Sequence, residues 1–184
     1  MQLLLAFMPF IVFAVSISEL GSVAALLLGA LASAILVGHG LLSGRSAKLL
    51  EVGSLVLFGA LAGFEYLSGA RLSLIGAKFA VDLGLFLIVV LSILIGLPFT
   101  LQYAKESVAP ELWSSPEFKR KNDVISMVWA GAFLVMVLAE LAMLAWPALP
   151  HRMPVFVIVV ALVGAFKFTQ SQRGARGSDS VQQS

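Results

Sequence analysis

The chain has 184 residues, of which 60% are hydrophobic and 12% are charged, and its formal net charge is +2. Soluble domains carry about 25% charged residues, so a soluble enzyme, a nucleic-acid-binding protein and a disordered chain are excluded. The sequence has no cysteine, which excludes disulfides, thiolate metal sites and cysteine nucleophiles. The class that remains is a multi-pass membrane protein whose outer surface faces lipid.

A helix needs about 20 apolar residues to cross a bilayer, and six stretches of the chain reach or approach that length. In chain order they are 3–19, 22–42, 50–68, 75–98, 124–146 and 153–169. We therefore expect residues 1–169 to form an all-α membrane domain, a bundle of six transmembrane helices arranged as three helical hairpins. Residues 170–184 are rich in Ser, Gln and Gly, and we expect a disordered cytoplasmic tail there.

The first stretch has the length of a signal peptide but lacks its flanking features. Residues 1–8 contain no Lys or Arg, and no small-residue cleavage site follows the apolar run. We therefore expect the first span to be retained.

An even number of spans places both termini on the same side of the membrane. That side holds nine of the 12 Lys and Arg residues, namely Arg45, Lys48, Lys105, Lys119, Arg120, Lys121, Lys167, Arg173 and Arg176. The opposite side holds Arg71, Lys78 and Arg152. Since short cytoplasmic loops carry an excess of Lys and Arg, both termini are predicted to be cytoplasmic.

The longest polar segment, residues 100–123, is predicted to be a cytoplasmic loop at the membrane surface. Trp113 would lie at headgroup level, and the run Lys119, Arg120 and Lys121 would contact anionic lipid headgroups. Alternatively, the same residues form a docking site for a cytoplasmic partner. The sequence leaves both interpretations open.

Ionisable side chains inside a membrane need a partner, water or an interface. Glu19 and Glu65 each lie in the last turn before a loop, so we expect both to be interfacial and solvated. Glu140 lies six residues before Trp146, about 9 Å along a helix at 1.5 Å per residue. It is therefore predicted to face the interior of the bundle.

The fourth span contains Lys78 and Asp82, which are four residues apart and share one helix face. They can form a self-contained ion pair, with Lys78 reaching the outer headgroups. In the alternative interpretation, Lys78, Asp82 and Glu140 meet in a polar pocket that opens outward. These three residues are the candidate polar site.

Small residues recur one turn apart, as in Gly29 with Ser33 and Gly59 with Gly63, which is typical of helix packing within a membrane bundle. The sequence has no H-E-x-x-H, G-x-S-x-G or Walker motif and no His pair at metal-ligand spacing. We therefore expect no catalytic, cofactor or metal site and a protein that is not an enzyme.

Several short motifs resemble the bacterial intracellular septation protein A family. They are the run Phe-Met-Pro-Phe at residues 7–10, Lys78 near the start of the fourth span, and the run Lys-Arg-Lys-Asn at residues 119–122 followed by Trp129. The resemblance covers about residues 5–145. It implies a small protein of helical hairpins in the bacterial cytoplasmic (inner) membrane.

The sixth span and residues 98–113 lie outside that pattern. Residues 98–113 resemble a group of uncharacterised bacterial polytopic inner-membrane proteins.

Three functions remain open, of which a lipid-handling enzyme has the least support because no catalytic motif is present. The first is a non-enzymatic inner-membrane protein that supports septation or cell-envelope assembly, as the resemblance implies, with a membrane-protein partner or a second copy of the chain. The alternative is a transporter or channel for a small solute or ion, built around Lys78, Asp82 and Glu140. The transporter or channel function requires the side chains of Lys78, Asp82 and Glu140 to lie close together.

Overall fold

The computed structural model describes residues 2–146 and 152–179, and every regular element in these ranges is a helix. The long helices are α3 (Ser22–Leu42), α4 (Leu49–Ser68), α5 (Leu74–Leu94), α7 (Pro116–Ala145) and α8 (Arg152–Asp179). The short ones are α1 (Gln2–Ala6), α2 (Met8–Leu20), α6 (Phe99–Lys105) and the 3-10 helix η1 (Pro110–Leu112). The predicted all-α class is confirmed for these residues.

Serine caps and left-handed glycines set several helix ends. Ser73 Oγ accepts a hydrogen bond from the backbone N–H of Gly76 at the start of α5, and Ser115 Oγ accepts one from Phe118 at the start of α7. These caps satisfy N–H groups that the first turn of a helix leaves unpaired. Gly69 ends α4 with a φ of 67°, a conformation that residues with a Cβ rarely adopt.

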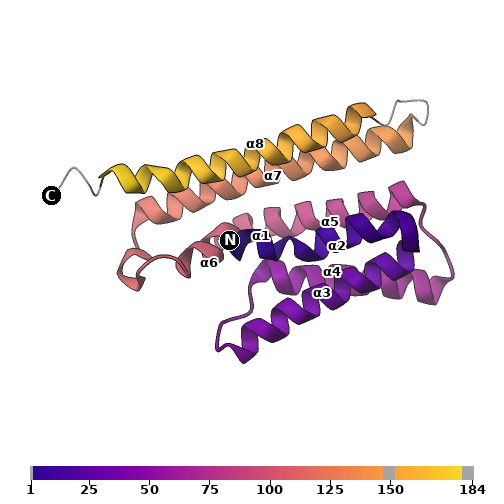
Figure 1. The fold of residues 1–184 in the computed structure, drawn as a ribbon, viewed down its shortest axis with the longest axis horizontal. Coiled ribbons are helices and arrows are strands. Elements are labelled where there is room, and N and C mark those ends of the chain that lie inside the picture. The colour runs from indigo at the N-terminus through magenta and orange to yellow at the C-terminus, as the bar shows by residue number, and fades with distance from the viewer. Residues whose placement is uncertain (1, 147–151, 180–184) are drawn as a thin grey trace.

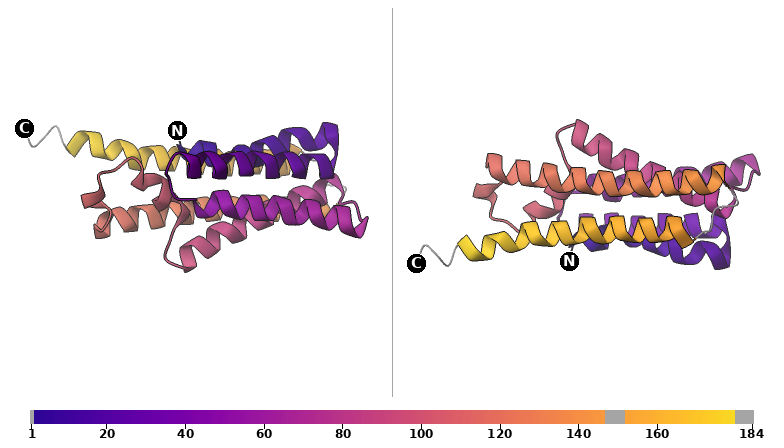
Figure 2. Two further views of the ribbon diagram at one scale, coloured as in Figure 1. Left: turned by 90° about the horizontal axis from the view of Figure 1, so that it is seen from below. Right: turned by 90° about the horizontal axis from the view of Figure 1, so that it is seen from above.

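The helices form an elongated bundle in which α7 and α8 lie side by side above α2, α3, α4 and α5 (Figure 1). The extensive contacts join α2 to α3, α3 to α4, α5 to α7, and α7 to α8. Contacts between α4 and α5 are fewer, so α5 packs mainly on α7 although α4 precedes it in the chain. The views from below and above show the same lengthwise arrangement (Figure 2).

The ends of the bundle hold different parts of the chain. The start of α1, the short helix α6 and the C-terminal part of α8 lie toward the left end of Figure 1. The turn between α4 and α5 lies toward the right end. We call these the first and second ends of the bundle.

Two apolar clusters form the core. One packs Phe13, Ile17 and Phe58 with other side chains of α2, α3, α4 and α5. The other joins α1, α5, α6, α7 and α8, and at its centre Phe7 stacks on Trp129 with ring centroids 5.0 Å apart. The aromatic side chain that precedes α2 therefore holds the N-terminal segment against α7.

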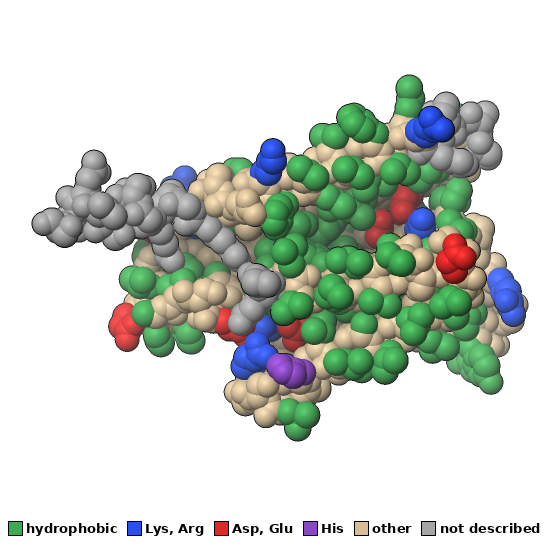
Figure 3. Space-filling model, viewed as in Figure 1, with side chains coloured by type: hydrophobic (Ala, Val, Ile, Leu, Met, Phe, Trp, Pro, Cys, Tyr) green, Lys and Arg blue, Asp and Glu red, His purple; other side chains and the backbone are tan. Residues whose placement is uncertain are grey.

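Five helices, α3, α4, α5, α7 and residues Arg152–Gln172 of α8, are long and apolar enough to cross a membrane. Large apolar side chains are exposed along them, among them Leu31 and Val56, which are 56% and 64% exposed. Hydrophobic side chains cover much of both helical layers in Figure 3. These features indicate a membrane-embedded, multi-pass protein.

The helices at both ends of the described chain differ from the predicted spans. The first predicted span, 3–19, is divided between α1 and α2 because the chain turns at Phe7, ahead of the proline in the first turn of α2. α2 has 13 residues and is shorter than the five candidate spans. α8 continues to Asp179, ten residues into the stretch 170–184 for which a disordered tail is predicted, and residues 180–184 lie outside the described chain.

The fourth predicted span, 75–98, is too long by several residues. α5 ends at Leu94, because Gly96 adopts a φ of 72° and Pro98 follows shortly after it. Pro98 instead precedes the first residue of α6.

The predicted loop at 100–123 contains more helix than expected. It contains most of α6, all of η1 and the start of α7, which begins at Pro116 rather than at 124. The extension is stable because Phe118 and Asn122 are buried on one face of it. Asn122 Nδ2 also donates a hydrogen bond to the carbonyl of Phe118.

Candidate functional site

The candidate polar site is built by α5 and α7, which pack closely along their length. Lys78 and Asp82 lie one turn apart on α5, and Glu140 lies toward the second end of the bundle on α7. The carboxyl groups of Asp82 and Glu140 lie close enough to share a hydrogen bond when one of them is protonated, and Lys78 interacts electrostatically with both. The structure thus brings together the three residues that the sequence had singled out.

The two carboxyl groups differ in burial. Glu140 is 3% exposed and Asp82 is partly buried. Glu140 Oε2 has no hydrogen-bond partner in the described chain. Figure 3 shows acidic and basic side chains gathered in the hollow between the two helical layers, near the right of the view.

A hydrogen bond between two carboxyl groups requires a proton on one of them, since ionised carboxylates only accept. With one shared proton the pair carries a single negative charge, which the ammonium of Lys78 balances. Loss of that proton would leave an uncompensated charge in a low-dielectric region, which is costly. The arrangement can therefore hold one proton, or a cation in its place.

A third acidic residue, Glu65, is buried against prediction. Glu65 is 3% exposed, and its Oε2 accepts a hydrogen bond of 2.7 Å from Ser22 Oγ. Its Oε1 has no hydrogen-bond partner in the described chain. The prediction that Glu65 is solvated is wrong, because α3 covers the last turn of α4, whereas Glu19 is exposed as expected.

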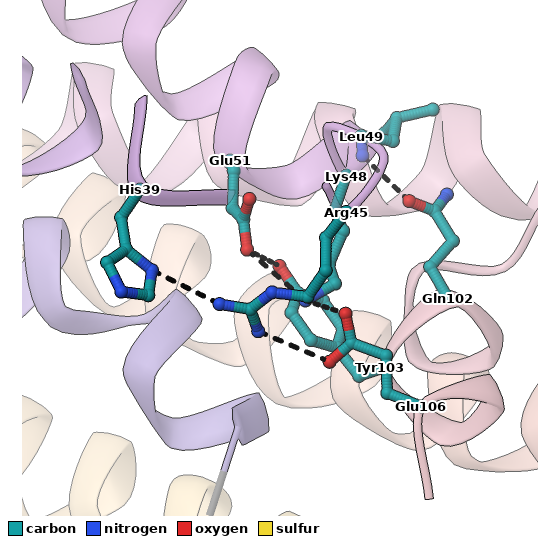
Figure 4. Close-up of polar contacts among 8 residues, drawn as sticks. All are labelled: His39, Arg45, Lys48, Leu49, Glu51, Gln102, Tyr103 and Glu106. Carbon is teal, nitrogen blue, oxygen red and sulfur yellow. Dashed lines mark hydrogen bonds and ion pairs between the residues drawn. The ribbon is translucent and has the colours of Figure 1, made fainter. Parts of the chain in front are cut away.

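A second polar cluster lies at the first end of the bundle, and the sequence did not predict it (Figure 4). Lys48 Nζ lies 2.8 Å from Glu106 Oε1 and 3.6 Å from Glu51 Oε1. Arg45 lies beside it, with Nη1 3.8 Å from Glu106 Oε2 and Nη2 3.1 Å from His39 Nδ1. We call these five residues the end cluster.

Tyr103 packs beneath the end cluster. Lys48 Nζ lies 4.4 Å above its ring, and its hydroxyl donates a long hydrogen bond of 3.5 Å to Glu51 Oε1. Burial, and then the negative charge of Glu51, raise the pKa of Tyr103 well above its usual value. The phenol is therefore a neutral donor that orients Glu51.

The sequence contains one signal that indicates part of the end cluster. Lys48 and Glu51 have the i,i+3 spacing of a helical ion pair at the start of α4. Their third partner, Glu106, follows α6 and could not be assigned without the fold. The backbone N–H of Leu49 donates to Gln102 Oε1 at 2.8 Å, so α6 also caps α4.

The candidate lipid or partner contacts lie at the same end. Lys119 and Arg120 are exposed on the first turns of α7, whereas Lys121 is half-buried and lines a cavity of ≈ 230 Å³. Trp113 is 37% exposed, and its Nε1 donates to the carbonyl of Val108 at 3.0 Å. Three of the four residues are therefore exposed, and the fourth, Lys121, is partly enclosed by the cavity.

In the described residues, no group of three or more His, Asp or Glu side chains could hold a metal ion. The candidate site is accordingly an arrangement of one lysine and two carboxylic acids. No protein-family model, curated protein or solved structure matches this chain.

Proposed function

We propose that the protein is a small membrane transporter in which Asp82 and Glu140 hold a proton that exchanges with a cationic solute. One observation carries this proposal, the approach of these two carboxyl groups across α5 and α7 to a separation at which they can share a proton. Ionisable residues at membrane depth commonly mark proton relays and ion pathways. A purely structural ion pair would need only Lys78 and Asp82.

Charge balance predicts that one proton is exchanged for one monovalent cation. With one proton on the acid pair, Lys78, Asp82 and Glu140 are together neutral. A monovalent cation bound in place of the proton preserves that neutrality, whereas an empty deprotonated site does not. The site therefore favours replacement of one cation by the other over release without uptake.

The proposal also includes the orientation of the protein in the membrane. The excess of Lys and Arg at the first end of the bundle supports cytoplasmic termini and six crossings in a bacterial cytoplasmic membrane, with α1 and α2 forming the first. In that orientation the acid pair lies in the outer half of the membrane. A proton would enter from the outer surface, near the end of α7.

The test is a direct measurement of proton binding followed by flux. In infrared titrations of reconstituted protein, the absorption of a protonated carboxyl group should be lost in Glu140→Gln and retained in Glu19→Gln, a matched change at an exposed carboxylate. Liposomes loaded with a pH-sensitive dye should show proton movement in response to a cation gradient with wild type. They should show none with Glu140→Gln.

Two results would overturn the proposal. One is an infrared spectrum in which Glu140→Gln leaves the protonated-carboxyl absorption unchanged. The other is proton flux that is equal in wild-type, Glu140→Gln and protein-free liposomes under every cation gradient tested.

The second candidate is a non-enzymatic inner-membrane protein that supports septation or envelope assembly. The exposed cations Lys119 and Arg120 at the first end of the bundle favour it, because they offer a contact surface for a partner. The resemblance to the septation protein A family points the same way. In this case Lys119→Gln with Arg120→Gln should disturb cell division, while Glu140→Gln should not.

A further inference from the structure

A groove of ≈ 1010 Å³ runs between α4 and α5 at the first end of the bundle. It forms where these two helices separate, since their mutual contacts are fewer than those of α3 with α4 or α5 with α7. Its apolar walls include Val52 from α4, Ile88 and Leu91 from α5, and Ile95, which directly follows α5. The volume matches the upper range of small-molecule sites, about 300–1,000 Å³.

The walls are open to the surroundings of the bundle. Val52 is 40% exposed and Leu91 is 55% exposed, although both lie on helices apolar enough to span a membrane. From Ile88 to Ile95 the apolar wall extends about 10 Å at 1.5 Å per residue. A flexible hydrocarbon chain fits this shape, because it can enter from the side of the bundle.

The end of the groove is charged. Arg45, Lys48 and Lys105 line it together with a single carboxylate, Glu106. Lys48 lies 2.8 Å from Glu106 and 3.6 Å from Glu51, which stands behind it, so the three cations face two carboxylates and one positive charge remains. Arg45 and Lys105 are the two cations that can contact an anion in the groove.

These two cations are only partly engaged within the protein. The Arg45 side chain is 37% exposed, reaches Glu106 only at 3.8 Å, and has one hydrogen bond of 3.1 Å, to His39. Lys105 Nζ lies 5.4 Å from the centre of the Trp113 ring, and the described residues include no ion pair for it. Tryptophan beside lysine is typical of the headgroup level of a membrane.

We propose that this groove binds one anionic phospholipid, with its phosphate between Arg45 and Lys105 and an acyl chain against Val52, Ile88 and Leu91. The occupant must be apolar along the wall and anionic at one end, and must reach the site from the bilayer. An anionic phospholipid meets all three requirements. The inference is independent of the proton site, which lies toward the second end of the bundle.

The test is native mass spectrometry of the purified full chain titrated with phosphatidylglycerol or with phosphatidylcholine of identical acyl chains. Wild type should retain one phosphatidylglycerol in preference to phosphatidylcholine. With each cation near the surface contributing about 1 kcal/mol, Arg45→Gln combined with Lys105→Gln should weaken phosphatidylglycerol binding about 30-fold. Lys119→Gln, at an exposed cation outside the groove, is the control and should leave binding unchanged.

The apolar wall is tested from both helices. Val52→Trp and Leu91→Trp each place a large side chain in the groove and should reduce binding of both lipids. Val56→Trp and Leu87→Trp change exposed residues outside the groove on the same helices and are the matched controls. Thermal melting identifies any variant that fails to fold, and the partner variant on the other helix then provides the test.

Equal retention of the two lipids by wild type would overturn the proposal. So would an equal loss of binding in Lys119→Gln, because binding would then follow the net charge rather than the groove. Unchanged binding in both folded tryptophan variants would place the lipid elsewhere on the protein.

Discussion

Lys48 Nζ lies 2.8 Å from Glu106 Oε1, and this contact holds the start of α4 against the end of α6. The Lys48 side chain is 8% exposed and the Glu106 side chain 19%. A second carboxylate, Glu51, lies 3.6 Å from the same ammonium. One buried cation therefore serves two carboxylates from different helices.

Replacing this cation should destabilise the protein strongly. Lys48→Met leaves Glu51 and Glu106 without their shared cation, and breaking a buried ion pair typically costs about 3–5 kcal/mol. Lys119→Met, at an exposed residue, should change stability by less than about 0.5 kcal/mol. Unfolding in detergent by heat or denaturant measures both, and equal stability of the two variants would contradict a buried role for Lys48.

Tyr103 should make stability depend on pH in the alkaline range. Its pKa is raised in the folded protein by burial and by Glu51, with Glu106 adding to the effect, whereas the unfolded chain has a value near 10. The contribution of the neutral Tyr103 phenol to the free energy of unfolding is therefore complete below about pH 10. It is lost as pH rises above that value, because the phenol then ionises in the unfolded chain but not in the folded protein.

The measurement compares wild type with Tyr103→Phe between about pH 9 and pH 11. The melting temperature of wild type should fall more steeply with pH than that of the variant. Tyr66→Phe, at an 81% exposed side chain, controls for removal of a phenol that is not buried. Parallel curves for wild type and Tyr103→Phe would show that the buried phenol does not contribute.

The long helices were predictable because their residues are apolar over the length that a bilayer requires. The predicted stretch 22–42 coincides with α3, and 50–68 differs from α4 by one residue. The start of α7 was missed because residues 116–123 are polar, and polarity does not distinguish a capped helix from a loop. Ser115 followed by Pro116 is the signal that marks this helix start.

The polar contacts were predictable only in part. Periodicity placed Lys78 and Asp82 on one face and Glu140 inside the bundle, but which helices face each other is a property of the fold. The same applies to Glu65, since its partner Ser22 comes from the start of α3. Sequence spacing locates polar groups along a helix, whereas packing determines their partners.

Glu140 should tolerate an amide better than an apolar side chain. Glu140→Gln keeps a donor for the Asp82 carboxylate, which Lys78 can then balance. Glu140→Leu leaves Asp82 without that partner and should cost about 1–3 kcal/mol. Melting in detergent distinguishes the two, with Glu19→Leu as the control at an exposed residue; a higher midpoint for Glu140→Leu than for Glu140→Gln would refute the acid pair.

Gly29 should be intolerant of any larger residue. A Cβ at Gly29 would lie 2.7 Å from the ring of Phe58, which is fully buried. Overpacking of this kind typically costs about 1–3 kcal/mol, so Gly29→Ala should lower the melting temperature. Gly63 has nothing within 4 Å of such a Cβ, and Gly63→Ala is the matched control; equal effects at the two glycines would contradict the close approach of α3 and α4.

The proposed topology requires α1 and α2 together to cross the membrane. A reporter active only outside the cytoplasm should be active when fused after Gly21 or after Arg71, and silent when fused after Gly44 or at the C-terminus. The excess of Lys and Arg at the first end of the bundle is the physical reason, since positive loops remain cytoplasmic. Activity at the C-terminus together with silence after Arg71 would reverse the orientation. Silence after both Gly21 and Gly44, with activity after Arg71, would instead show that α1 and α2 do not cross, and that α4 is the first helix to emerge.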